Sequence, residues 1–109
     1  LTPATHHLIG VRELAWMRPT AFLINTARGP IIDEEALVEA LKKRVIAGAG
    51  LDVYEQEPAI HSALAQVKQT VLLPHLGSAT LHARTQMGLV CVDNIQAVLG
   101  GHPAPNKIP

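Results

Sequence analysis

The stretch AFLINTARG, residues 21–29, decides the fold, because it joins a short aliphatic run to a polar loop that ends in glycine. Such a run, bounded by loop residues, predicts a buried strand. Residues 46–51 and residues 70–73 are two more aliphatic runs, and proline ends the second of these. Glycines inside residues 46–51 would allow a helix to approach that strand closely.

Helical patterns separate the predicted strands. A short helix is predicted over residues 10–17, and Pro19 ends it. A second helix begins at residues 33–35, which are acidic, and ends at the basic residues 42–44, as the helix dipole favours. Its apolar stripe is formed by Ala36, Leu37, Ala40 and Leu41. Residues 79–99 form the longest predicted helix, which is apolar on most sides, so we expect it to be buried on more than one side. Alternation of strands and helices predicts an α/β fold with a parallel sheet and flanking helices.

Composition limits the partners of this chain. Its 109 residues fit one domain, and 48% of them are hydrophobic, which argues against disorder. The formal net charge is zero, so no basic field is available to hold nucleic acid or an anionic membrane. Aromatic residues are only 3% of the chain, too few for a platform that stacks bases. The single cysteine, Cys91, fits a reducing compartment, so we expect a cytoplasmic protein.

Polar side chains follow each predicted strand, where parallel sheets bind ligands. Arg28 follows the first strand, Asp52, Glu55 and Glu57 follow the second, and His75 follows the third. Arginine binds carboxylates with two parallel hydrogen bonds, and histidine exchanges protons near neutral pH. Taken singly, each residue has a simpler interpretation as a surface charge, a structural histidine or a turn cap. Because these groups follow three neighbouring strands of one predicted sheet, we expect them to form a ligand-binding or catalytic site together.

Two other patterns do not predict sites. Residues 48–50 resemble the start of a dinucleotide fingerprint, but no third glycine opens a helix after them. The histidines lack the spacing of a helical zinc site, so no metal is expected. We interpret Cys91, which lies on the apolar face of its helix, as a packing residue rather than a nucleophile.

Three long motifs in order identify a family resemblance. LINTARG at residues 23–29, AGLDVYEQEP at residues 49–58 and LPHLGSAT at residues 73–80 resemble the D-isomer-specific 2-hydroxyacid dehydrogenase family. Residues 75–80 and 87–89 look most like the glyoxylate/hydroxypyruvate reductases within it. The resemblance implies a Rossmann-like parallel sheet that belongs to an NAD(P)-binding domain.

The resemblance also implies roles for individual residues. Arg28 would bind the carboxylate of a small 2-keto acid, His75 would act as general acid and base, and Glu57 would be the acid partner of that histidine. Asp52 would hold the nicotinamide carboxamide. The formate dehydrogenase branch has no such glutamate, so Glu57 favours a keto-acid substrate. The implied cofactor-binding residues are Thr2, Pro3, Thr26, Ala27, Arg28, Asp52, His75, Gly77 and Ser78.

The chain departs from the family by lacking the Gly-x-Gly-x-x-Gly turn. We therefore interpret residues 1–101 as the second half of a cofactor domain, and residues 102–109 as an extended tail that leads back to a substrate domain outside the chain. The choice between NAD and NADP stays open. Family members are typically dimers through this domain, so a homodimer is expected. Two alternatives remain, an NAD(H)-sensing protein that resembles the transcriptional corepressors of this family, and a module used only for dimerisation.

A first prediction concerns the 109-residue chain by itself. We expect it neither to bind the nucleotide tightly nor to turn over, because the turn that binds the phosphates is missing from it. A titration with NADH measures this directly, and micromolar affinity would overturn the expectation.

Overall fold

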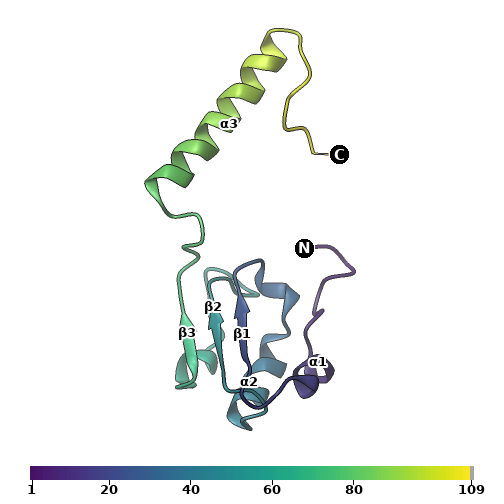
Figure 1. The fold of residues 1–109 in the computed structure, drawn as a ribbon, viewed down its shortest axis with the longest axis vertical. Helices are drawn as coiled ribbons and strands as arrows, with labels where there is room; N and C mark the ends of the chain where they lie inside the picture. Colours follow the sequence, from purple (N-terminus) through teal and green to yellow (C-terminus); the bar gives the residue numbers. More distant parts are fainter. Residues whose placement is uncertain (109) are drawn as a thin grey trace. The chain divides into compact units, whose positions relative to one another are not determined.

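The computed structural model describes residues 1–108 and contains a sheet of three parallel strands (Figure 1). The strands are β1 (Phe22–Asn25), β2 (Gly48–Leu51) and β3 (Thr70–Leu72), and β2 lies between the other two. Phe22 is opposite Gly48, and Ala49 is opposite Thr70. The predicted parallel sheet is therefore confirmed.

The helices follow the predicted order. They are α1 (Val11–Trp16), α2 (Glu34–Lys42) and α3 (Leu81–Leu99), and two short 3-10 turns, η1 (Gly29–Ile31) and η2 (Leu64–Gln66), were not predicted. The α2 helix begins where the charge pattern indicates, because the Asp33 carboxylate accepts a hydrogen bond from the backbone N–H of Ala36 at 3.0 Å.

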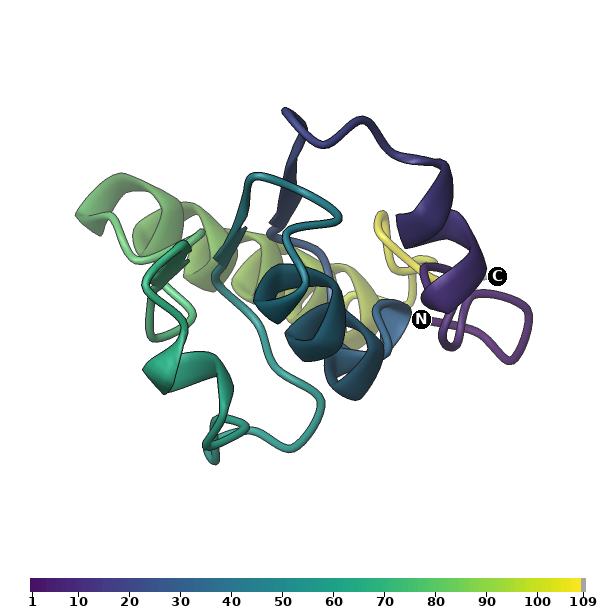
Figure 2. The ribbon, with the colours of Figure 1, turned by 90° about the horizontal axis from the view of Figure 1, so that it is seen from below.

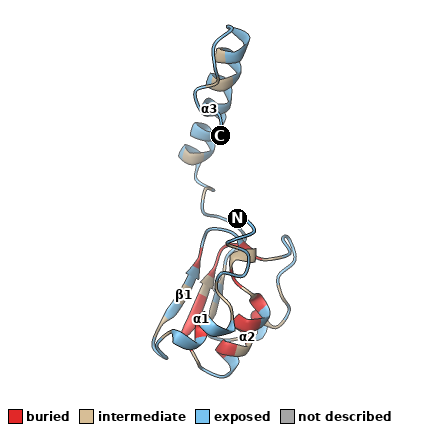
Figure 3. Cartoon of the chain, turned by 90° about the vertical axis from the view of Figure 1, so that its right-hand side faces the viewer, coloured by how far each residue is buried: buried red, intermediate tan, exposed pale blue. Residues whose placement is uncertain are grey.

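The core lies on one face of the sheet. There α1 and α2 pack against one another, and their buried side chains join those of β2 (Figures 2 and 3). All four residues of the predicted α2 stripe are buried, together with Val38. Burial of this aliphatic layer is the main stabilising contribution in the first 77 residues.

The opposite face of the sheet is open in this chain. Phe22, Ile24 and Val71 are 68%, 65% and 63% exposed, so only β2 is buried as expected, and β1 and β3 are covered on one face. A Cβ added at Gly48 would meet the Phe22 ring at 3.0 Å, and one at Gly50 would meet Ile24 Cδ1 at 3.0 Å. The Gln69 carbonyl also lies 2.6 Å from a Cβ at Gly48, so the space beside these glycines is taken by the Gln69 backbone and by side chains of β1 rather than by a helix.

The chain divides into two compact units, Leu1–Gly77 and Ser78–Pro109. The second unit contains α3, in which the Thr80 hydroxyl accepts a hydrogen bond from Ala83 N–H at 3.1 Å. No residue of α3 is buried, so its expected burial on several sides is not found among residues 1–108 (Figure 3). After α3, the Asn106 N–H donates to Asn94 Oδ1 at 3.0 Å. Pro109, the end of the expected tail, lies outside the described residues.

None of the described helices combines the length and the apolar character that crossing a bilayer requires.

Gly29 provides a test of how closely the loops pack. A Cβ at this position would overlap the backbone of Tyr54 and of Glu55. We expect Gly29→Ala to lower the free energy of unfolding by about 2 kcal/mol or more, as overpacking does. Urea unfolding measures the change.

Gly88→Ala is the matched control, because nothing lies within 4 Å of an added Cβ there and alanine favours the helix by about 1 kcal/mol. If Gly29→Ala is as stable as the unchanged protein, the backbones of Gly29 and Tyr54 do not approach as closely as described.

Candidate active site at the carboxyl ends of the strands

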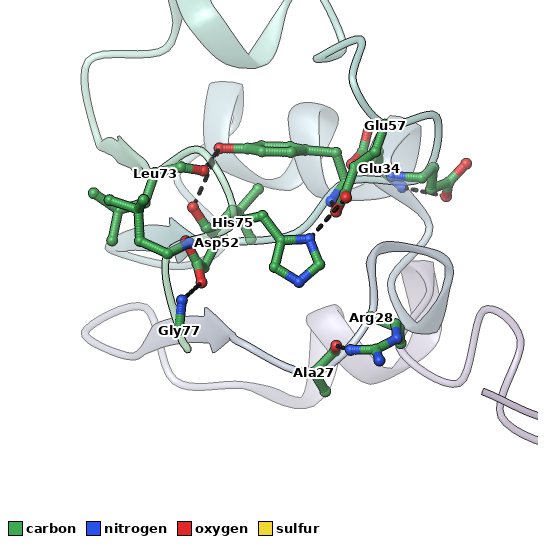
Figure 4. A network of polar contacts seen from close by, with 12 residues as sticks. Ala27, Arg28, Glu34, Asp52, Glu57, Leu73, His75 and Gly77 are labelled. Carbon is green, nitrogen blue, oxygen red and sulfur yellow. Dashed lines mark hydrogen bonds and ion pairs between the residues drawn. The ribbon is translucent and has the colours of Figure 1, made fainter. Parts of the chain in front are cut away.

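A histidine and a glutamate pair directly at the ends of β2 and β3. His75 Nδ1 lies 2.8 Å from Glu57 Oε2 (Figure 4). An ionised carboxylate at this distance favours the tautomer in which Nδ1 carries the proton. The side chain of His75 is 47% exposed, and no hydrogen bond from residues 1–108 reaches its Nε2. That nitrogen therefore faces the solvent and is free to meet a ligand.

Glu57 is held at both carboxylate oxygens. While Oε2 pairs with His75, Oε1 accepts a hydrogen bond from the backbone N–H of Tyr54 at 3.0 Å. The hydrogen bond from His75 is the largest cause that lowers the pKa of Glu57, and the bond from Tyr54 is the second. Glu57 therefore stays ionised and accepts at both oxygens, which orients the ring of His75 through Nδ1.

Asp52 fixes the loop that carries His75. Its Oδ1 accepts from Leu76 N–H at 2.6 Å, and its Oδ2 accepts from Gly77 N–H at 2.7 Å (Figure 4). Asp52 is only 3% exposed, so these two bonds compensate for the burial of its charge. His75 has a left-handed backbone, with φ of 56°, which needs such support in a residue other than glycine. From the sequence alone, Asp52 could equally have capped a turn, and no local signal pointed to this loop.

Among residues 1–108, the guanidinium of Arg28 has no carboxylate partner. Its Nη1 donates to the Ala27 carbonyl at 2.6 Å, and no ion pair to Arg28 occurs within the part of the chain that is described. Asn25 shapes this loop, because its Nδ2 donates to the Arg28 carbonyl at 2.9 Å and its Oδ1 accepts from Ala27 N–H at 3.1 Å. Asn25 was not among the predicted site residues, although a polar residue that ends an aliphatic strand is a usable signal. The exposed guanidinium can bind an incoming carboxylate.

The side chain of Glu55 bonds different partners from that of Glu57. Its Oε1 accepts from Glu34 N–H at 3.1 Å, and Glu34 Oε1 accepts from Glu55 N–H at 2.9 Å. Burial is the main cause that raises the pKa of Glu34. These reciprocal bonds attach the loop after β2 to the first turn of α2, so Glu55 supports the site without facing His75.

One group of side chains with metal-binding atoms was not foreseen. Ligand atoms of His7, Asp33 and Glu55 all lie within 4.8 Å of one another. The two carboxylates approach opposite ring nitrogens, however, with Nδ1 4.0 Å from Asp33 Oδ2 and Nε2 2.8 Å from Glu55 Oε1. A metal ion binds one imidazole nitrogen. In this geometry the ring of His7 lies between two carboxylates, and no single ring nitrogen is close to both.

Two cavities adjoin the strand ends. One, of about 330 Å³, is lined by Glu57 and His75, and the other, of about 370 Å³, by Thr26 and Asp52. Thr2 and Pro3 lie in an exposed turn of the first unit and line neither of these two cavities. Ser78 begins the second unit and is described with it.

Comparisons with known proteins agree with the motifs. Residues 1–77 match the family described as D-isomer specific 2-hydroxyacid dehydrogenase, NAD binding domain. The chain is 48% identical over 108 residues to a glyoxylate reductase of Thermococcus gammatolerans, covering 99% of the chain and 32% of that protein. It is 50% identical over 109 residues to glyoxylate/hydroxypyruvate reductase B of Enterobacter agglomerans, covering 99% of the chain and 34% of that protein.

Solved structures show the same likeness. The NADPH-dependent glyoxylate/hydroxypyruvate reductase of Sinorhizobium meliloti, in complex with NADP and malonate, matches with a TM-score of 0.85 and 43% identity. That match covers 88% of this chain and 30% of the other. The chain thus spans about a third of the length of the curated relatives it matches.

The pairing of Glu57 with His75 makes a prediction about titration. We expect His75→Gln to raise the pKa of Glu57 toward its usual value of 4.5, because the largest cause of the lowering is removed. The lowered pKa stabilises the folded state above the usual value, and this stabilisation is lost as pH falls through the lowered pKa. A carbon-13 NMR titration of the Glu57 carboxyl measures the midpoint.

His61→Gln is the control, since His61 pairs with Glu35 at 3.0 Å and not with Glu57. An unchanged Glu57 midpoint in His75→Gln would contradict the pairing.

Proposed function

Since the chain belongs to the D-isomer specific 2-hydroxyacid dehydrogenase family, in its NAD binding domain, we propose that the full-length protein reduces a small 2-keto acid. The observation that carries this proposal is the pairing of His75 with ionised Glu57. Glyoxylate and hydroxypyruvate are the favoured substrates, because the relatives at about 50% identity are named for reducing them.

His75 is the proposed general acid. When a hydride reaches the carbonyl carbon, negative charge develops on the keto oxygen, and the proton on Nε2 neutralises it. General acid catalysis of this kind contributes about 10²–10⁴-fold. Glu57 stabilises the imidazolium before the transfer and orients the ring through Nδ1. In the reverse direction the same imidazole takes the proton from a 2-hydroxy acid.

Arg28 is the proposed anchor for the substrate carboxylate. Its guanidinium is exposed and forms no ion pair within residues 1–108. It is also the smallest named cause of the lowered pKa of Glu57, which supports a role for its charge beside the His75 pair. Two parallel hydrogen bonds from Arg28 would fix the keto acid in one orientation.

The residues present fit the nicotinamide end of a dinucleotide. The cavity of about 370 Å³ is lined by apolar residues that include Ile24 and Val71, and by the polar residues Thr26 and Asp52. An apolar lining with a few polar groups suits a flat aromatic ring. When bound, the nucleotide supplies the hydride. We propose NAD or NADP as the cofactor.

Three expectations from the sequence stay predictions. They are a homodimer formed through this domain, a cytoplasmic location, and the inactivity of the 109-residue chain by itself. The roles of Thr2, Pro3, Ala27, Gly77 and Ser78 in holding the nucleotide are likewise proposals.

Substitutions in the full-length protein test the proposed roles. We expect His75→Gln to lower kcat by about 10²–10⁴-fold, because the proton donor is lost. Arg28→Ala should lower kcat/KM for the keto acid by about 10²-fold or more, mainly by raising KM, since charged hydrogen bonds to the carboxylate are lost. Assays with glyoxylate and hydroxypyruvate, using NADH and NADPH, measure both changes.

The matched controls are His102→Gln and Arg18→Ala, which remove the same groups from exposed positions elsewhere in the chain. Normal activity in His75→Gln or Arg28→Ala would show that the assigned roles are wrong.

A further inference from the structure

Tyr54 connects the loops that carry the proposed reactive residues. We propose that Tyr54 is a positioning residue that fixes the separation of His75 and Glu57, an inference that rests on the proposed function. Its side chain is buried at the end of β2, and the residue is only 5% exposed. Its hydroxyl lies 2.8 Å from the Leu73 carbonyl oxygen and 3.2 Å from that of Leu51.

The hydroxyl has one proton, and the shorter bond identifies its acceptor as Leu73. The Leu51 carbonyl already accepts a hydrogen bond from Leu73 N–H at 2.8 Å. No other donor to the Leu73 carbonyl occurs within residues 1–108. Removal of the Tyr54 hydroxyl would therefore leave this partly buried carbonyl without its protein partner, which is costly.

Leu73 is the last anchored residue before His75. Pro74 stands between them and has no N–H to donate, so it adds no backbone bond. Beyond His75, Asp52 holds the next two backbone amides. The left-handed backbone of His75 is therefore fixed on one side by Tyr54 and on the other by Asp52 (Figure 4).

Tyr54 also fixes Glu57 through its own backbone. The Tyr54 N–H bonds Glu57 Oε1, and the other carboxylate oxygen bonds His75. On the opposite side, the backbone of Tyr54 touches Gly29, the residue after Arg28, so closely that no Cβ fits between them. One buried residue thus contacts the loops of the proton donor, of its acid partner and of the carboxylate anchor.

The consequence concerns proton transfer more than nucleotide binding. Loss of the hydroxyl would let residues 73–75 drift and lengthen the contact between His75 and Glu57. A misplacement of about 1 Å at a reacting group can cost about 10²-fold in rate. Tyr54 itself does not line the cavity where we place the nicotinamide, and its hydroxyl reaches that cavity only through the backbone carbonyls of Leu51 and Leu73.

The test compares Tyr54→Phe with Thr70→Val in the full-length protein. Thr70 is the matched control, because its hydroxyl also lies near two carbonyls, of Val67 at 2.7 Å and of Leu64 at 3.1 Å, but at the opposite end of β3. We expect Tyr54→Phe to lower kcat by about tenfold or more, and to change KM for the nucleotide by a smaller factor. The solvent deuterium isotope effect on kcat should rise, because proton transfer becomes slower. In Thr70→Val we expect kcat and its solvent isotope effect to stay unchanged. The melting temperature should fall in both variants, because each loses a buried hydrogen bond.

If Tyr54→Phe lowers only the melting temperature, as Thr70→Val does, the role of Tyr54 is purely structural and the proposal is overturned.

A second measurement does not depend on activity. The hydrogen-bonded Nδ1 proton of His75 should give a low-field NMR signal, assigned by its loss in His75→Gln. This signal should persist in Thr70→Val and disappear in Tyr54→Phe, and its persistence in Tyr54→Phe would also overturn the proposal. A protein that reduces no keto acid but shows this NMR pattern would refute the proposed function and support the positioning role.

Discussion

The site depends on a buried carboxylate that bonds two consecutive backbone amides. Asp52 ends β2, yet both of its oxygens are used by the loop that follows β3. An unpaired charge at 3% exposure would cost several kcal/mol, so the carboxylate is stable there only while the loop supplies its N–H groups. The same bonds hold His75 in its left-handed backbone conformation. The burial of Asp52 and the placement of the His75 imidazole therefore depend on each other. Neither the carboxylate nor the loop is stable in this position without the other.

Buried polar residues hold the backbone, and exposed ones are left to react. Asn25, Glu34, Asp52 and Tyr54 are buried, and each bonds backbone groups of a loop at the carboxyl ends of the strands. The groups that we assign to chemistry, on Arg28, Glu57 and His75, are exposed. Such a division suits catalysis, since reactive groups need access to the ligand and also a fixed frame.

The sequence predicts the elements well, because they follow from local patterns. Aliphatic runs locate the strands, and the charges at the two ends of α2 locate that helix to within a residue. Parallel pairing then implies that residues after each strand meet, which brings His75 and Glu57 together. Local patterns do not show which face of a sheet is covered, so the exposure of Phe22 and Ile24 was missed. They also do not show bonds between distant residues, and the contacts of Asp52 with the loop after His75 span 24 and 25 positions.

The contact between Gly29 and the backbone of Tyr54 has a consequence for the size of ligand that the site can use. It joins the loop of Arg28 to the loop of Glu57, so the backbones that carry the guanidinium and the imidazole pair are in direct contact. A keto acid of two or three carbons makes few contacts, and it has little interaction energy with which to order mobile loops. Preorganisation by a glycine that allows two main chains to touch would let the proposed small substrate be recognised with a smaller entropic penalty for loop closure.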